Sequence, residues 1–229
     1  MKNPLIIILM IFFSTISAIG CDFKKSRAES AEVKPVVCVI NIDRTGSYQF
    51  LNKAKEITIN IIKRLPDGSR VYVRWITEDS NSDRASIVSA IIPDTRRPKN
   101  PFDVKAKEMH KVLMAKKLHI QRQIINAINS AKSPMARRTD IYGALYAAGE
   151  RFGNASDMPP LLILLSDMED NVGNQYSINL KGADVRILGY QVSSKEEGRK
   201  RKWSEYLRSA GASNVRFSHI DEPLSFGGF

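Results

Sequence analysis

Two aspartates that follow apolar runs are the residues of this chain best suited to chemistry. The run from Val36 to Ile42 ends at Asp43, and the run from Leu161 to Leu165 is followed by Ser166 and Asp167. Runs this uniformly apolar are typical of strands buried on both faces in the middle of a parallel sheet. Parallel strands bring their carboxyl ends to one edge, where ligands of open α/β sheets bind. We therefore expect Asp43 and Asp167 to lie close together.

Two neighbouring carboxylates repel each other unless a proton or a cation lies between them. A bound divalent metal ion is the simplest solution for Asp43 and Asp167. The spacing of the two acids in the sequence thus predicts a metal site at the carboxyl edge of the sheet.

Three segments carry a resemblance to a known family. The segment Asp43-Arg44-Thr45-Gly46-Ser47 resembles the metal-ion-dependent adhesion motif of von Willebrand factor A domains, whose usual form is Asp-x-Ser-x-Ser. Further along, Thr139 and Asp140 resemble the family's threonine segment, which opens a helix, and Asp167 resembles the aspartate that closes the fourth strand. Met168 then stands where many members have glycine. The resemblance covers roughly residues 34 to 220.

The resemblance implies a set of ligands and a mode of binding. Thr45, Ser47 and Thr139 would offer neutral oxygens to the metal, and Asp43 and Asp167 would hold it directly or through water. The implied ion is Mg²⁺, or Mn²⁺ or Ca²⁺ in its place, since these ions take oxygen ligands. Neutral hydroxyls leave the ion strongly positive, so an acidic side chain of a protein partner can fill an open coordination position. No small-molecule substrate is implied.

The hydrophobic pattern predicts a three-layer, doubly wound α/β fold with a mostly parallel sheet of about six strands. We expect strands at 36–43, 70–77, 86–92, 161–167, 185–190 and 215–220. Helices are expected at 48–64, at 104–131, from about 140, and from about 193 to a cap at Gly211. The link from Glu78 to Arg84 is too short for a crossover helix, so the strand at 86–92 is expected to be antiparallel at an edge.

The first 20 residues have the pattern of a secretory signal: a basic start, an apolar core and small residues at the end. Ala18-Ile19-Gly20-Cys21 resembles a bacterial lipobox, so we expect a lipid on Cys21. An uncleaved signal anchor over 4–20 is the alternative. Both place the chain at the bacterial cell envelope, outside the cytoplasm and attached to a membrane, and Asp22 after the cysteine implies retention at the inner membrane. Residues 21–33 read as a flexible tether, 34–220 as the domain and 221–229 as a tail.

Positive charge is concentrated in one part of the chain. The net charge is +11, and the segment from Arg96 to Arg138 holds twelve Lys and Arg against two acids. This pattern fits a solvated helix face, or a contact with an anionic partner such as lipid headgroups. Nucleic acid is disfavoured, because the chain is exported and no aromatic residues interleave with the basic ones. An alternative function is therefore an electrostatic adaptor of the same fold, with a structural or vacant metal site.

The sequence disfavours an enzyme. It lacks a P-loop, a Gly-x-Gly-x-x-Gly segment after a strand and a Gly-x-Ser-x-Gly elbow. Dehalogenase-like phosphatases need a second aspartate where Thr45 stands, and the three histidines lack the spacing of zinc ligands. The acids from Asp167 to Asp170 suggest a metal nuclease only faintly. With Cys21 lipidated, Cys38 has no partner for a disulfide and is expected to be a small core hydrophobe.

Overall fold

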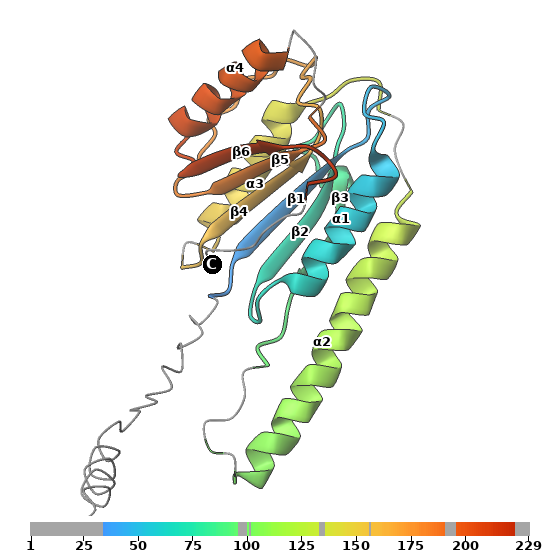
Figure 1. Ribbon diagram of the computed structural model, residues 1–229, viewed down its shortest axis with the longest axis vertical. Helices are drawn as coiled ribbons and strands as arrows, with labels where there is room; N and C mark the ends of the chain where they lie inside the picture. Colours follow the sequence, from blue (N-terminus) through green and yellow to red (C-terminus); the bar gives the residue numbers. More distant parts are fainter. Residues whose placement is uncertain are drawn as a thin grey trace, which may run out of the picture. The chain divides into compact units, whose positions relative to one another are not determined.

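The computed structural model describes residues 34–95, 100, 102–132, 136–155, 157–190 and 196–222, which belong to one compact unit (Figure 1). In chain order, the elements are β1 (Val37–Asp43), α1 (Leu51–Arg64), β2 (Arg70–Ile76), the short 3₁₀ helix η1 (Asp83–Ala85), β3 (Ser86–Ile91), α2 (Val104–Ser130), α3 (Ile141–Gly153), β4 (Pro160–Leu165), β5 (Asp184–Leu188), α4 (Glu196–Ser209) and β6 (Asn214–Ser218). The predictions for residues 1–33 and 223–229, and for a helix start near 193, lie outside the described residues.

The strands of the described part form one sheet in the order β3-β2-β1-β4-β5-β6. The central strand β1 is parallel to β2 on one side and to β4 on the other, and all seven of its residues are buried. β3 pairs antiparallel with β2 at the edge. The predicted doubly wound α/β fold with an antiparallel edge strand is therefore confirmed. Because β1 and β4 are neighbours, the residues that follow both strands come to the same edge.

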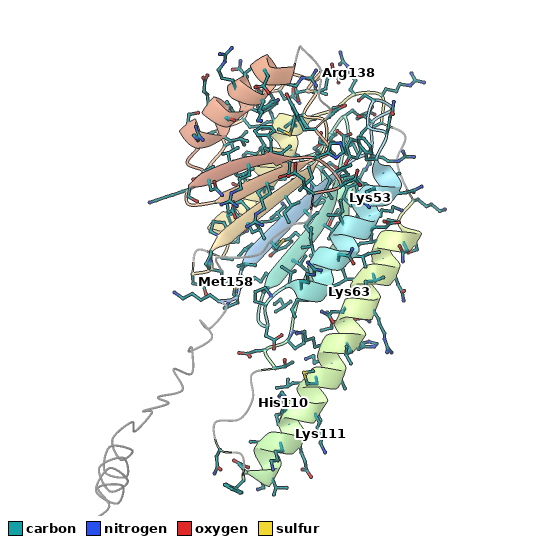
Figure 2. All side chains as sticks on the ribbon, in the orientation of Figure 1. Lys53, Lys63, His110, Lys111, Arg138 and Met158 are labelled. Carbon is teal, nitrogen blue, oxygen red and sulfur yellow. The ribbon has the colours of Figure 1, made fainter. Side chains whose placement is uncertain are left out.

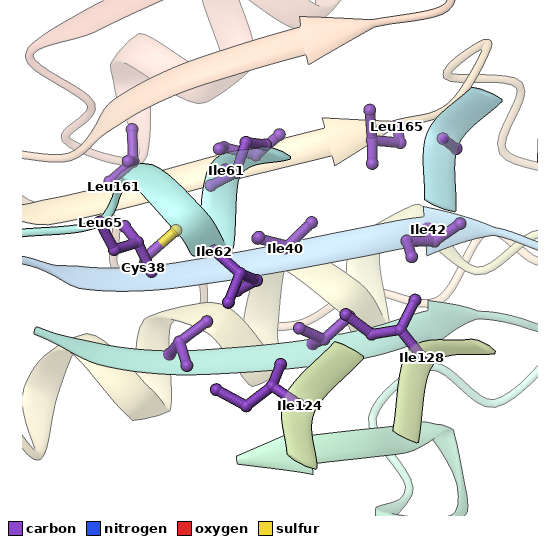
Figure 3. Packing of buried hydrophobic residues seen from close by; sticks show 14 of the residues in the cluster. Cys38, Ile40, Ile42, Ile61, Ile62, Leu65, Ile124, Ile128, Leu161 and Leu165 are labelled. Atoms are coloured by element: carbon purple, nitrogen blue, oxygen red, sulfur yellow. The ribbon is translucent and has the colours of Figure 1, made fainter. Parts of the chain in front are cut away.

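Two apolar clusters fill the spaces between the sheet and its helices. On one face, α1 and α2 pack against the side chains of β1 that include Cys38 and Ile40 (Figure 3). On the other face, α3 and α4 pack against the alternate residues of β1, such as Val39. Cys38 is a free, fully buried thiol, and burial raises its pKa to about 12. It is a core hydrophobe, as the sequence predicts.

Helix α1 begins at Leu51, three residues later than the pattern predicts. The backbone N–H of Tyr48 donates to the carbonyl of Thr45 at 3.2 Å, which closes a turn just after β1. The helical hydrogen bonds begin afterwards, with the N–H of Ala54 donating to Phe50 at 2.8 Å. Hydrophobic periodicity alone does not reveal this turn, because Tyr48 is buried like a helix residue.

Among the described residues, the buried side chains of α2 lie in its second half. Ile124 and Ile128 enter the core, and the side-chain amide of Gln121 donates to the carbonyl of Ile62 at 3.2 Å. One turn earlier, Lys117 pairs with Asp67 in the turn between α1 and β2. Residues 104–116 then continue past the edge of the sheet, where Figure 2 labels His110 and Lys111. We call residues 104–116 the overhang of α2.

The pairing of Asp67 with Lys117 predicts a pH-dependent contribution to stability. Burial by itself would raise the pKa of Asp67, but the hydrogen bonds from Lys117 and Thr95 outweigh it and lower this pKa below 3.8. A carboxyl whose pKa is lower in the folded state than in the unfolded chain stabilises the protein at pH values above its unfolded-state pKa. This stabilisation is lost as the pH falls through the folded-state pKa. We expect Asp67→Asn to lower the free energy of unfolding at neutral pH, and the difference from the parent to shrink below pH 3.8. Urea unfolding at a series of pH values measures both.

The matched control is Asp157→Asn, which removes an exposed carboxylate elsewhere on the domain. It should leave the pH dependence of the parent unchanged. A difference between Asp67→Asn and the parent that stayed constant on acidification would contradict the role assigned to this pair.

No helix among the described residues is both long and apolar enough to cross a bilayer.

Candidate metal centre

Asp43 lies at the end of β1, where its carboxylate is fully buried. One oxygen accepts hydrogen bonds from the backbone N–H and the hydroxyl of Thr45, at 2.9 and 2.7 Å. The other accepts from the hydroxyl of Ser166 at 2.6 Å. Burial raises the pKa of Asp43 above 3.8; the hydrogen bonds from Ser166 and Thr45 oppose this shift, and the charge of Asp167 adds to it. Asp167 therefore lies close enough to Asp43 to be felt electrostatically.

The hydroxyls of the motif form a continuous group with Asp43. The Oγ1 atom of Thr45 lies 3.2 Å from the Oγ atom of Ser47. Thr45 is buried and Ser47 is exposed, so the group reaches from the end of β1 to the surface. The predicted ligands Asp43, Thr45 and Ser47 are thus together, with one side facing solvent.

Thr139 precedes α3 and is held by the loop that follows β4. Its N–H donates to the side-chain oxygen of Asn171 at 2.7 Å, and the N–H of Asn171 donates back to the carbonyl of Thr139 at 3.1 Å. A backbone bridge between Thr45 and Ala136 ties the same segment to the motif. The hydroxyl of Thr139 is buried and has no hydrogen-bond partner among the described residues. A buried hydroxyl without a partner is costly unless a group from outside the protein satisfies it.

Asp140, next to Thr139, caps α3 instead of joining the cluster. Its Oδ1 atom accepts from the N–H of Gly143 at 2.8 Å, and its Oδ2 atom accepts from Ser80 at 3.3 Å. A Cβ at Gly143 would lie 2.0 Å from the carboxylate, so this close cap needs glycine. The cap fixes the direction in which the chain passes Thr139.

Asp167 lies in the loop after β4, and side chains of α4 donate hydrogen bonds to the backbone of this loop. Met168, which stands where the sequence resemblance implies a glycine, is buried and has a φ of 60°. Its carbonyl accepts a hydrogen bond from the indole N–H of Trp203 at 2.9 Å, and the carbonyl of Asp167 accepts one from Arg199 at 3.2 Å. These two contacts and the burial of the Met168 side chain keep the loop in a conformation that residues other than glycine rarely adopt.

Two residues near the cluster were not predicted from the sequence as part of the site. Ser166 donates to Asp43; the sequence offers a signal for it, because Ser166 follows the strand that pairs with β1. Tyr48 has a buried hydroxyl without a hydrogen-bond partner among the described residues. Burial raises the pKa of Tyr48, and the charges of Asp43 and Asp167 raise it further. The hydroxyl of Tyr48 therefore lies within electrostatic range of both carboxylates.

The position of Tyr48 depends on Gly189 at the end of β5. Gly189 has a φ of +88°, and a Cβ there would lie 2.6 Å from the hydroxyl of Tyr48. We expect Gly189→Ala to lower the free energy of unfolding by roughly 1–3 kcal/mol, from backbone strain and from displacement of the ring. Chemical unfolding measures this change.

The control for Gly189→Ala is Gly182→Ala, because Gly182 has a similar φ of +77° and open space where the Cβ would go. The difference between the two variants isolates the contact with Tyr48. Equal destabilisation by both variants would contradict that contact.

The donor set of the cluster fits a hard cation. Its members are oxygens only: two carboxylates and several hydroxyls, which is the chemistry that Mg²⁺, Mn²⁺ and Ca²⁺ select. The partnerless hydroxyl of Thr139 is consistent with a metal ligand. Within the described part of the chain, no Lys, Arg or His side chain forms an ion pair with Asp43 or Asp167, and no group of three or more His, Cys, Asp and Glu is placed to hold a metal ion by itself.

Comparisons with known proteins identify the fold. No protein-family model matches the chain, and no curated protein matches its sequence at a significant level. Among solved structures, a von Willebrand factor type A structure from Catenulispora acidiphila is 21% identical with a TM-score of 0.51, over 83% of this chain and 40% of that one. The chain thus spans two fifths of the length of that protein.

Two further structures match less well. Proximal thread matrix protein 1 from the mussel byssus, described with a zinc-occupied MIDAS motif, is 14% identical with a TM-score of 0.44, over 68% of this chain and 38% of that one. An aerotolerance-related membrane protein from Bacteroides fragilis, with multiple mutations to serines, is 12% identical with a TM-score of 0.44, over 82% and 92%. Likeness at this level concerns the fold alone.

Proposed function

The chain has the fold of von Willebrand factor A domains, and from this premise we propose that it is a metal-dependent protein-binding module. Asp43, Thr45, Ser47, Thr139 and Asp167 would hold a divalent cation, with Mg²⁺ as the first candidate and Mn²⁺ or Ca²⁺ as alternatives. When bound, the cation supplies an electrophilic centre for a carboxylate of a protein partner. The proposal includes no enzymatic step.

The observation that carries this proposal is the hydrogen bond of 2.6 Å that the hydroxyl of Ser166, the residue before Asp167, donates to Asp43. Asp167 contributes to the raised pKa of Asp43, and no cationic side chain of the described residues pairs with either. Two such carboxylates need a compensating charge. A divalent cation supplies it, and the buried hydroxyl of Thr139 gains a partner at the same time.

The residues of the chain have distinct roles in this proposal. Thr45 and Ser166 donate hydrogen bonds to Asp43 and so fix the direction of its carboxylate. Trp203 and Arg199 hold the loop of Asp167 through its backbone carbonyls. Ser47, as the exposed member, lies where a partner's carboxylate would arrive. Hydrogen bonds thus hold the acidic residues from the protein side, and Ser47 is exposed on the solvent side, which suits recognition of a partner.

A capture experiment from detergent-solubilised envelope tests the function. The parent chain should retain a partner in Mg²⁺ and release it on addition of EDTA, whereas added salt should have little effect. Asp43→Asn should retain nothing, and Asp157→Asn should behave like the parent. Release by salt but not by EDTA would contradict the proposal and favour the electrostatic adaptor.

We further propose that the module is attached to the bacterial cell envelope through a lipid on Cys21, and Asp22 favours the inner membrane. The support is the lipobox-like segment before Cys21. Cys21→Ser should leave the signal uncleaved or release the chain from the membrane, as measured by the mature mass and by labelling with a fatty acid. An unchanged mass and unchanged labelling would refute the anchor.

A further inference from the structure

Exposed apolar side chains of the described residues gather at one end of the domain. The large hydrophobic residues that are exposed are Ile91, Phe102, Val104, Met109, Val112, Met114 and Leu118. All except Ile91 belong to α2 or lie just before it, and Ile91 ends the edge strand β3, which leads toward α2. Phe102 is 87% exposed and Val112 is 62% exposed. Such a concentration on an otherwise polar surface indicates an interaction site.

This apolar surface lies at the edge of the sheet where the parallel strands begin, which is opposite the edge that holds the metal centre. β1 and β2 start at that edge and run away from it, and the overhang of α2 extends past it (Figure 1). The pair of Lys117 and Asp67 marks the level of the sheet edge, so the thirteen residues of the overhang, Val104–Lys116, reach roughly 20 Å beyond it.

The chain enters the domain at the same edge. Pro35, just before β1, contacts the turn at Gly68, whose Cβ position would lie 3.4 Å from the Pro35 Cβ atom. The residues that connect Cys21 to Lys34 can span at most roughly 40 Å when extended. A membrane that holds Cys21 would therefore be within reach of the overhang.

The overhang combines positive charge with apolar groups. It contains four lysines and one glutamate. Lys105, Met109, Val112 and Lys116 have the spacing that places them on one helix face, and all four are exposed. Lysines next to apolar side chains suit the boundary between lipid headgroups and acyl chains, because the ammonium groups reach the phosphates while the apolar groups enter below them.

We propose that the overhang of α2 binds the surface of an anionic lipid bilayer, namely the membrane to which the chain is attached. The bilayer is favoured over an acidic protein because the overhang and the point where the chain enters the domain at Pro35 share one edge, and the overhang carries four lysines against one glutamate. Bound in this way, the domain presents its metal centre away from the lipid. The identity of the membrane rests on the lipid attachment proposed above, whereas binding by the overhang depends on α2 and not on the metal.

Hydrogen exchange of the full chain mixed with vesicles tests the proposal. The backbone amides of residues 104–116 should exchange at least about tenfold more slowly with phosphatidylglycerol vesicles than with phosphatidylcholine vesicles, since two lysines near an anionic surface supply that much protection. The readout is local to α2, so it does not depend on Cys21, and adding EDTA should not change it.

Two double variants distinguish an effect of the overhang lysines from an effect of the net charge of the domain. Lys105→Glu with Lys116→Glu should abolish the protection by phosphatidylglycerol. Arg201→Glu with Lys202→Glu makes the same change in charge on exposed positions of α4 and should preserve it. Equal exchange with both kinds of vesicle, or equal loss in both double variants, would overturn the proposal, and the first result would assign the surface to a protein partner.

Discussion

Asp43→Asn is expected to abolish the rise in melting temperature that Mg²⁺ gives to the parent chain. A ligand that binds only the folded state stabilises it by about 2.7 kcal/mol at a hundredfold excess over its Kd. For a domain of this size, that corresponds to a rise of roughly 5–11 °C. The asparagine amide carries no charge to hold the cation, although its oxygen can still accept from Thr45 and its NH₂ group can donate to the hydroxyl of Ser166. Thermal melts followed by circular dichroism, in Mg²⁺ and in EDTA, measure the effect.

The same melts distinguish loss of metal from failure to fold. Burial raises the pKa of Asp43, which means that folding without the metal disfavours its ionised form relative to the neutral one. In EDTA, Asp43→Asn should therefore melt no lower than the parent. Asp157→Asn removes an exposed carboxylate and should keep the full response to Mg²⁺. An equal rise for Asp43→Asn and the parent would refute the metal centre.

Thr139→Val is expected to change stability in opposite directions with and without metal. The hydroxyl of Thr139 is buried without a partner among the described residues. Valine has the same shape and no polar group, so the metal-free domain should gain roughly 1–3 kcal/mol of stability. The response to Mg²⁺ should fall, because the cation loses a ligand. Urea unfolding in EDTA and in Mg²⁺ measures the two effects.

Thr139→Ser is the control for this prediction, since it keeps the hydroxyl and removes only the methyl group. It should retain most of the response to Mg²⁺. A valine variant that is less stable than the parent in EDTA would mean that the hydroxyl makes a contact within the protein. The ligand role would then have to pass to another residue.

The central strands could be predicted because their sequences carry a strong signal. β1 and β4 are apolar on both faces, which is typical of a covered parallel strand; β1 ends at Asp43, and β4 is followed by Ser166 and Asp167. The short link before β3 fixes its antiparallel direction for a similar reason, since a crossover needs more residues. These signals lie in the chemistry of single segments and need no knowledge of tertiary contacts.

The surroundings of the metal centre could not be predicted, because they depend on contacts between distant segments. The role of Tyr48 depends on Gly189 at the end of β5, and the buried conformation of Met168 depends on Trp203 of α4. Helix periodicity likewise predicts the length of α2. Periodicity does not show that the first half of this helix extends beyond the sheet, because that depends on the ion pair between Lys117 and Asp67 in the α1–β2 turn.

The neighbouring positions of β1 and β4 have a consequence for how the domain folds. The hydrogen bond from Ser166 to Asp43 joins residues that are 123 positions apart in the chain. Closing so long a loop is slow, and parallel pairs of this kind form late in folding. A growing chain that has produced β1 but not β4 has no place for the cation. If the chain crosses the membrane unfolded, the proposed metal centre would be completed only in the compartment in which folding finishes, and the ion content of that compartment would select the ion.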